Sequence, residues 1–148
     1  MSRIRRILHP SDFSPASSAA FKRAVEMAKG NRAELLVVHV LTPSVPIVAD
    51  GYVSPQVYED MTSATRAYAR KHLDALVGKA KRAGARAKGL LLDGVSHERI
   101  ARAARARKAD LIVIGTHGRT GFAKFFVGSV ASRVLAIAPC PVLTVRGR

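Results

Sequence analysis

The strongest constraint on the fold is a regular alternation between short apolar segments and longer amphipathic ones. Leu, Ile and Val dominate most of the short segments, and continuous apolar runs of this kind predict parallel strands that are buried on both faces. The predicted strands are Ile4–His9, Glu34–Leu41, Arg86–Leu92, Leu111–Ile114 and Val142–Arg146. The predicted helices between them are Pro15–Lys29, Pro55–Ala83, Ser96 to just before Ala109, and Ser129–Ala138. Strict β-α alternation predicts an α/β fold with one doubly wound parallel sheet and helices on both of its faces.

Local signals set the ends of the predicted helices. Ser14 is a candidate cap with Pro15 at the first helical position, and Ser96 and Ser129 are candidate caps of two later helices. Gly84 closes the long second helix. The predicted inner positions of that helix are Tyr58, Met61, Ala69, Leu73, Leu76 and Ala80.

Length and composition predict a single globular domain that spans residues 1–148. The one cysteine, Cys140, excludes an internal disulfide framework and fits a reducing compartment. The start of the chain lacks the apolar core of a signal peptide, and the sequence has no run of about 18 apolar residues that could span a membrane. We therefore expect a soluble cytoplasmic protein without a membrane partner.

The formal net charge of +15 is unevenly distributed along the chain. Residues 75–148 carry fifteen of the 25 Lys and Arg residues but only three of the ten acidic ones. Such a charge attracts nucleotides, nucleic acid and acidic membranes alike, and does not choose between them. The best nucleic-acid candidate is the run Arg99, Arg102, Arg105, Arg107 and Lys108. It contains no aromatic side chain for base stacking, and such a run is more often a solvated helix face.

A glycine-bearing loop after Leu111–Ile114 is the clearest candidate binding site. Glycine recurs in this loop at positions 115, 118, 121 and 128, and allows the backbone to approach a ligand closely. The N-terminus of the helix that begins at Ser129 offers free N–H groups and the positive end of its dipole. With the nearby cations Arg119 and Lys124, these groups predict an anion pocket, with phosphate as the best candidate. The loop matches neither the Walker A pattern nor the G-x-G-x-x-G of dinucleotide folds.

The spacing Gly115-x2-Gly118-x9-Gly128-Ser129 resembles the G-x2-G-x9-G-[ST] signature of the ATP-binding branch of the universal stress protein family. The segments GTHGRTGF and GSVASRVL around it, and PCPVLTVR beyond, are also similar to that family. The resemblance implies a Rossmann-like sheet in the order 3-2-1-4-5, with the ligand above the carboxyl ends of strands 1 and 4. An independent rule predicts the same place, because ligands of open α/β sheets bind where the strand order reverses.

The resemblance also implies roles for individual residues. In the motif Pro10-Ser11-Asp12, the aspartate would contact the adenine end of the nucleotide, and Val40 would lie against adenine or ribose. The phosphates would be held by Gly115, Gly118, Gly128 and Ser129, with Arg119 nearby. Simpler interpretations remain: Asp12 as a turn carboxylate, Val40 as a core residue, the glycine loop as an ordinary connection, and Arg119 as a solvated cation.

We interpret the protein as a nucleotide-responsive stress module that binds ATP, with Mg²⁺ as a candidate companion ion. Hydrolysis should be slow at most, because Asp12 and Asp93 are the only carboxylates expected near the phosphate loop. None of the five histidines stands at a spacing typical of zinc ligands, so no metal site is predicted. The family's usual turn after strand 3 is altered here, where Gly94-Val95-Ser96 stands in place of a segment that often contains proline.

The predicted last strand, Val142–Arg146, contains a short apolar stretch, Val142–Val145, that is expected to lie at the sheet edge. In the resembled family this strand pairs across a two-fold axis, so a homodimer is expected. Two other functions stay open. One is a basic interaction protein that binds nucleic acid or an acidic partner with the nucleotide pocket empty. The other is a small enzyme that handles phosphoryl groups.

Overall fold

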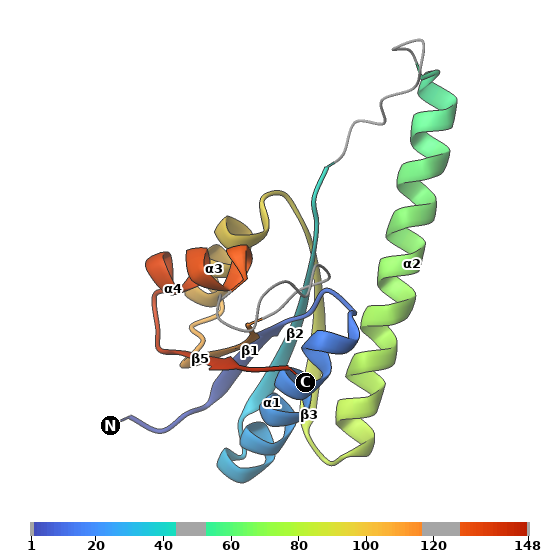
Figure 1. Cartoon of the computed structure of the whole chain (residues 1–148). Helices are drawn as coiled ribbons and strands as arrows, with labels where there is room; N and C mark the ends of the chain where they lie inside the picture. The colour runs from blue at the N-terminus through green and yellow to red at the C-terminus, as the bar shows by residue number, and fades with distance from the viewer. Residues whose placement is uncertain (1, 44–52, 117–127, 148) are drawn as a thin grey trace.

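The computed structural model describes residues 2–43, 53–116 and 128–147 (Figure 1). Its strands are β1 Arg6–Pro10, β2 Glu34–Leu41, β3 Arg86–Asp93, β4 Leu111–Gly115 and β5 Val142–Val145. Its α-helices are α1 Ser18–Asn31, α2 Pro55–Arg82, α3 Ser96–Ala106 and α4 Ser129–Ile137, and a short 3-10 helix, η1, covers Pro15–Ser17. Each of these elements lies within a few residues of its predicted position.

The strands form one sheet in the order β3-β2-β1-β4-β5, and all four neighbouring pairs are parallel. This confirms the predicted fold class and strand order. The order reverses between β1 and β4, because the chain leaves β1 towards β2 and β3 but leaves β4 towards β5 on the other side. The carboxyl ends of β1 and β4 therefore border a crevice between diverging connections.

Side-chain alternation along the strands divides the core between the two faces of the sheet. Ile7 and Leu35 pack on the face that α1 and α2 cover, whereas Leu8 and Ile112 pack with the residues of α3 and α4. All four side chains are fully or almost fully buried. Strands covered on both faces in this way need apolar residues at consecutive positions, which explains the unbroken runs in the sequence.

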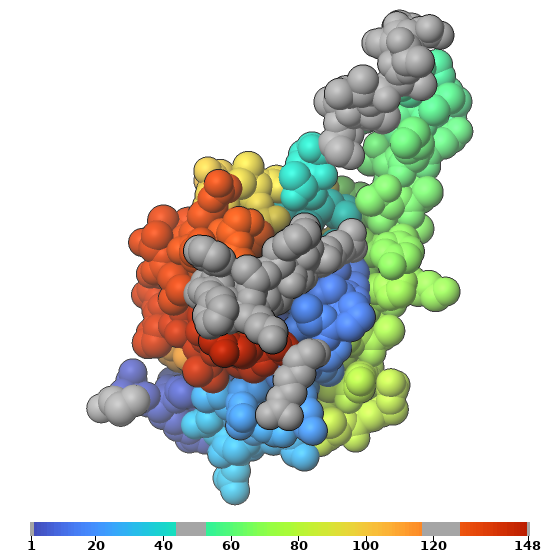
Figure 2. Space-filling view, viewed as in Figure 1, coloured from blue at the N-terminus to red at the C-terminus, as the bar shows by residue number. Residues whose placement is uncertain are grey.

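The first half of α2 projects beyond the sheet and the other helices (Figures 1 and 2). Its 28 residues span roughly 42 Å as an α-helix, whereas strand β3 with its eight residues spans only about 26 Å. The prediction that Tyr58 and Met61 lie inside was therefore wrong, since their side chains are 41% and 48% exposed. The predicted inner positions nearer the end of α2 were right: Ala69, Leu73 and Ala80 are buried, and Leu76 is half-buried.

The helix starts differ from prediction at three serines. Ser14 occupies the N-cap position of η1 with Pro15 as the first residue, as predicted, but its side chain makes no cap hydrogen bond and the α-helix begins only at Ser18. In α3 the N-cap position is Val95, and Ser96 is the first helical residue. In α4 the N-cap position is Gly128, so Ser129 is the first helical residue and not the cap.

Candidate functional site

A pocket of about 300 Å³ lies over the carboxyl ends of β1, β2 and β4. The loop after β1 and the start of α4 border it, and α3 contributes one wall. Its described lining consists of Pro10, Ser11, Asp12, Ser17, Val38, His39, Val40, Ser96, Ile100, Ile114, Gly115, Thr116, Gly128, Ser129, Val130 and Ala131. A concave site of this size at the reversal point of an open α/β sheet is typical of small-molecule binding.

The loop after β1 is fixed by hydrogen bonds from its own serines. The Ser14 backbone N–H and hydroxyl donate to Oδ1 of Asp12 at 2.9 and 2.5 Å. The Phe13 N–H donates to the hydroxyl oxygen of Ser11 at 3.1 Å, and Phe13 itself has a left-handed φ of 65°. This network holds the Asp12 carboxylate at the rim of the pocket before any ligand arrives.

His39 fastens the same loop to β2. Its Nδ1 lies 2.7 Å from the carbonyl oxygen of Ser11. Since a carbonyl can only accept, Nδ1 carries the proton and donates it. The imidazole ring also stacks on Phe13 with 4.2 Å between ring centroids. His39 thus links the β1 loop to the wall of the pocket.

The backbone of β2 continues past the end of β1 beside the pocket. The last paired residues of the two strands are Pro10 and Val38, and the Ser11 N–H donates to the Val38 carbonyl at 2.8 Å. Backbone groups alternate in direction along a strand, so the N–H and C=O of Val40 point to the same side as those of Val38. This places a donor and an acceptor of Val40 side by side beyond the end of β1, on the side of the pocket.

The opposite wall is the N-terminus of α4. Gly128 occupies the N-cap position, and the first turn of α4 contains no acidic residue. The first N–H groups of a helix lack intrahelical partners and lie at the positive end of its dipole. This end of the pocket is therefore suited to an anion.

The ends of the segment between β4 and α4 meet at the pocket. The Gly128 N–H donates to the Thr116 carbonyl at 2.5 Å, and the Thr116 N–H donates to the Val145 carbonyl at 3.0 Å. The start of α4 is thus held beside the end of β4 and tied to β5. The residues between them, 117–127, lie outside the described part of the chain.

Most of the predicted site residues are brought together in this pocket. They are Pro10, Asp12, Val40, Gly115, Gly128 and Ser129. Gly118 and Arg119, with the candidate cation Lys124, lie outside the described residues, so their predicted roles stay predictions. The pocket also contains residues that the sequence analysis did not select as binding residues, notably Ser17, His39, Ser96 and Thr116. Thr116 stands directly after Gly115 in the glycine motif, which was the available signal for it.

A neutral histidine lies in the sheet close to the pocket. His9 in β1 is fully buried, and its Nδ1 donates to the Val113 carbonyl at 2.9 Å. Burial lowers the pKa of His9 from 6.5 to about 4, against smaller raising effects of the Val113 hydrogen bond and of Asp12. In the neutral ring Nε2 is a bare acceptor. It is buried and has no hydrogen-bond partner among the described residues.

The described residues contain no group of three or more His, Cys, Asp or Glu side chains that could hold a metal ion. Asp12 supplies the one carboxylate in the described lining of the pocket. Asp93, the other predicted neighbour of the phosphates, instead forms an ion pair with Arg66 of α2. Burial, with a smaller effect of Asp110, raises the pKa of the Cys140 thiol, so Cys140 has no sign of thiolate reactivity.

Comparison with known proteins agrees with this architecture and gives the family. The family model described as universal stress protein family matches residues 3–146. The chain belongs to the universal stress protein family. The universal stress protein MJ0531 of Methanocaldococcus jannaschii is 34% identical over 144 residues, which are 96% of this chain and 82% of the relative.

Solved structures of universal stress proteins are similar throughout the chain. The universal stress protein UspA from Lactobacillus plantarum is 29% identical with a TM-score of 0.84, and the match covers 99% of this chain and 100% of that one. A universal stress protein crystallised in complex with cAMP is 26% identical with a TM-score of 0.71, again over 99% and 100% of the two chains. Within its described residues, this member of the family has no helix that is long and apolar enough to cross a membrane.

Proposed function

We propose that this universal stress protein binds an adenine nucleotide, ATP in the first place, and acts as a nucleotide-responsive module in stress physiology. The observation that carries the proposal is the pocket of about 300 Å³, which has a backbone edge of β2 at one wall and the N-terminus of α4 at another. The first suits a purine base and the second suits phosphates.

The adenine end would be read by the backbone of Val40. Adenine presents a donor (its amino group) next to an acceptor (a ring nitrogen), and the C=O and N–H of Val40 form the complementary pair. Asp12, held by Ser14, would contact the same end of the nucleotide. Recognition through backbone groups does not depend on which apolar side chain stands at position 40, so the Val40 side chain contributes only packing.

The phosphate end would be held by the N-terminus of α4, with Gly115 and Gly128 keeping the backbone accessible and the Ser129 hydroxyl as a further donor. The predicted contributions of Gly118 and Arg119 complete this proposal. The described lining offers Asp12 as its carboxylate, so Mg²⁺ would enter with the nucleotide and be held mainly by phosphate oxygens. The similar universal stress protein that was crystallised in complex with cAMP supports an adenine nucleotide as the class of ligand.

We propose binding, and not turnover, as the main activity. Efficient hydrolysis needs a positioned Mg²⁺, a group that orients the attacking water and usually a transition-state cation. The one carboxylate in the described lining, Asp12, is proposed to contact the adenine end and not the phosphates. The single cysteine fits a reducing compartment, and we place the protein in the cytoplasm.

The homodimer is part of the same proposal. Strand β5 is the edge of the sheet and pairs with β4 on one side only among the described strands. The exposed apolar residues Leu135, Ile137 and Leu143 lie in α4 and β5 next to this edge. Pairing of β5 with β5 of a second copy would satisfy its backbone groups and cover these side chains.

The proposal is tested by calorimetric titration of the purified protein with ATP, AMP, cAMP and inorganic triphosphate, after mass spectrometry of any co-purified nucleotide. We expect ATP to bind and to raise the melting temperature. A protein that binds none of the four ligands would overturn the nucleotide proposal and favour an interaction protein. Turnover far above background would instead favour the phosphoryl-handling enzyme.

A further inference from the structure

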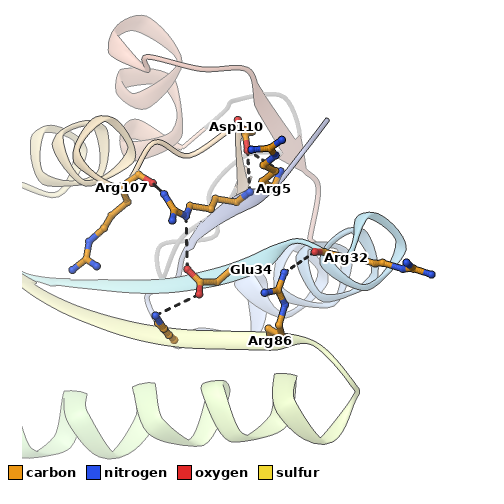
Figure 3. Close-up of polar contacts among 8 residues, drawn as sticks. Arg5, Arg32, Glu34, Arg86, Arg107 and Asp110 are labelled. Carbon is orange, nitrogen blue, oxygen red and sulfur yellow. Dashed lines mark hydrogen bonds and ion pairs between the residues drawn. The ribbon is translucent and has the colours of Figure 1, made fainter. Parts of the chain in front are cut away.

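The amino-terminal ends of the strands form a second charged surface, at the opposite end of the sheet from the nucleotide pocket. Figure 3 shows part of it, with labelled arginines just before β1, in the turn before β2, in β3 and just after α3. We call this surface the basic end. Its residues are all exposed: Arg3, Arg5, Arg6, Lys29, Arg32, Arg86, Lys88, Arg107 and Lys108.

A concavity of about 470 Å³ lies within the basic end. Its side walls carry the cations Arg3, Lys29, Arg32 and Arg86, and its remaining lining is Ala28, Ala33, Gly84 and Ala85. No carboxylate and no aromatic ring is among these lining residues. A hollow with cations on its walls and small residues between them concentrates positive potential and admits an anion.

The two carboxylates in this region leave most of the positive charge uncompensated. Glu34 lies 3.9 Å from Arg6 Nε and 3.5 Å from Lys88 Nζ. Asp110 accepts from the backbone N–H groups of Arg5 and Arg6 at 2.8 and 3.0 Å, so it fastens the start of β1 (Figure 3).

Two arginines of the basic end donate hydrogen bonds to carbonyls at helix C-termini, but their positive charge is not neutralised by these bonds. Arg86 donates to the Arg32 carbonyl at the end of α1, and Arg6 donates to the Arg107 carbonyl at the end of α3, at 2.7 and 2.9 Å. Cations are favoured at such helix ends. A guanidinium has five N–H donors, so each arginine keeps others for a ligand. Arg3 precedes β1 and belongs to no helix, yet it lines the same concavity.

The structure divides the basic run from Arg99 to Lys108, which the sequence offered as the best nucleic-acid candidate. Arg99 is half-buried, and its side chain packs beside Gly94, where an added Cβ would lie 3.0 Å from Arg99 Cγ. Helix α3 ends at Ala106, so Arg107 and Lys108 stand beyond it at the basic end. The basic end thus combines residues from both halves of the chain, which no single run in the sequence reveals.

We propose that the basic end binds the phosphate backbone of nucleic acid without reading its sequence. Guanidinium and ammonium groups are the usual partners of backbone phosphates. The cations come from several segments and extend beyond the concavity, which suits a polymer with many phosphates better than a single small anion. With no aromatic residue in the lining, base stacking has no support there.

The same surface is poorly suited to a membrane. The large exposed apolar residues of the described chain lie elsewhere, in α2, beside α3 and in α4 and β5. An electrostatic surface without apolar residues has nothing to insert into the acyl boundary. Acidic vesicles therefore serve as the contrasting ligand in the test.

The test is fluorescence anisotropy of the full chain with a labelled, mixed-sequence DNA duplex. The variant Arg3→Gln/Lys29→Gln/Arg32→Gln removes three cations of the concavity that donate no side-chain hydrogen bond in the described structure. The matched control Lys22→Gln/Lys71→Gln/Arg133→Gln removes the same charge from exposed positions on α1, α2 and α4. A second control, Arg102→Gln/Arg105→Gln, tests the exposed side of α3.

We expect the basic-end variant to lose at least about tenfold in affinity at low salt. Its salt slope should become shallower by about 2.7, at roughly 0.9 for each phosphate that the variant no longer neutralises. Both controls should lose less than about threefold, and duplexes of different sequence should bind equally well. Equal losses in the basic-end variant and the matched control would overturn the proposal. So would binding to phosphatidylserine vesicles in the absence of duplex binding.

This inference does not depend on the nucleotide pocket. The two sites lie at opposite ends of the strands, so Gly128→Val should bind the duplex with unchanged affinity. Loss of duplex binding in Gly128→Val would place the nucleic acid in the pocket and contradict the basic-end site. The same conclusion would follow if millimolar ATP abolished duplex binding in the wild type but not in Gly128→Val.

Discussion

The N–H of Gly128 donates a hydrogen bond to the carbonyl of Thr116, which closes the two ends of the segment between β4 and α4 against each other. The first turn of α4 is thereby held beside the carboxyl end of β4. The helix N-terminus and the end of the strand can then act on one ligand. The fold, and not the loop alone, positions the proposed phosphate site.

Gly128→Val should abolish detectable ATP binding while the protein still folds. Gly128 has φ −55° and ψ 155°, a conformation that any residue adopts, so the fold should lose only roughly 1–3 kcal/mol. The new side chain would occupy the crevice where the phosphates must approach the backbone. Calorimetric titration with ATP checks the loss of binding, and thermal unfolding checks that the variant still folds. Unchanged ATP affinity in the folded variant would refute the pocket.

Ser129→Ala is the milder companion variant. Since Gly128 and not Ser129 occupies the N-cap position, removal of the hydroxyl should leave the melting temperature nearly unchanged. ATP binding should weaken by about 1 kcal/mol, the typical contribution of one hydrogen bond. A large drop in melting temperature would show that the hydroxyl has a structural role after all.

Asp12→Asn should weaken ATP binding by roughly 1–2 kcal/mol and leave inorganic triphosphate almost unaffected. The amide oxygen of Asn can still accept from the N–H and hydroxyl of Ser14, so the loop is preserved while the charge is removed. The selective effect follows because the proposed contact of Asp12 is to the adenine end. Calorimetric titration with ATP and with inorganic triphosphate measures both affinities. Equal weakening of the two would mean that Asp12 contacts the phosphates and not the adenine end.

Leu143→Asp should convert the proposed homodimer to a monomer. Leu143 is exposed on the edge strand β5, and a charge there would be forced into the β5 pairing across the two-fold axis. Tyr68→Asp is the control, because Tyr68 is also a large exposed apolar residue but lies on α2, away from β5. Sedimentation velocity at tens of micromolar distinguishes the species. A wild type that sediments as a monomer would overturn the homodimer proposal.

Most of the fold could be predicted because its signals are local. The apolar runs Leu35–Val38 and Leu111–Ile114 are short and rich in β-branched residues, which favours inner strands, and glycine or proline stands at most of the predicted breaks. Tyr58 was misplaced because helical periodicity shows which face is apolar but not how far the sheet beneath it extends.

The pocket was harder to predict than the fold. Pro10, Asp12 and Gly128 were found through motif spacing, which records short-range constraints. His39 was not found, since its hydrogen bond to Ser11 joins residues that are 28 positions apart. The basic end was missed for the same reason, because a surface assembled from four separate segments has no signature in any one of them.

His9 should make the protein progressively less stable as the pH falls from about 6.5 to about 4. The ring is buried and neutral in the folded protein, with a pKa lowered from 6.5 to about 4 by burial. In this pH range the unfolded chain therefore binds a proton that the folded protein does not. The contribution of His9 to the free energy of unfolding is therefore fully present above pH 6.5 and declines as the pH drops towards 4. Since one pKa unit corresponds to about 1.4 kcal/mol, His9 alone should account for a loss of roughly 3 kcal/mol.

The variant His9→Leu isolates this contribution from that of the carboxylates, which titrate over part of the same range. Leucine fits an apolar site of similar size but cannot titrate, and it gives up the hydrogen bond to the Val113 carbonyl at a cost of about 1 kcal/mol. Urea unfolding at a series of pH values from 7 to 4 should therefore show the wild type losing stability relative to His9→Leu as the pH falls. Parallel curves for wild type and His9→Leu would mean that His9 has nearly the same pKa in the folded and unfolded states. An NMR titration of the His9 ring would decide the matter directly, since the neutral ring should persist, protonated at Nδ1, down to about pH 4.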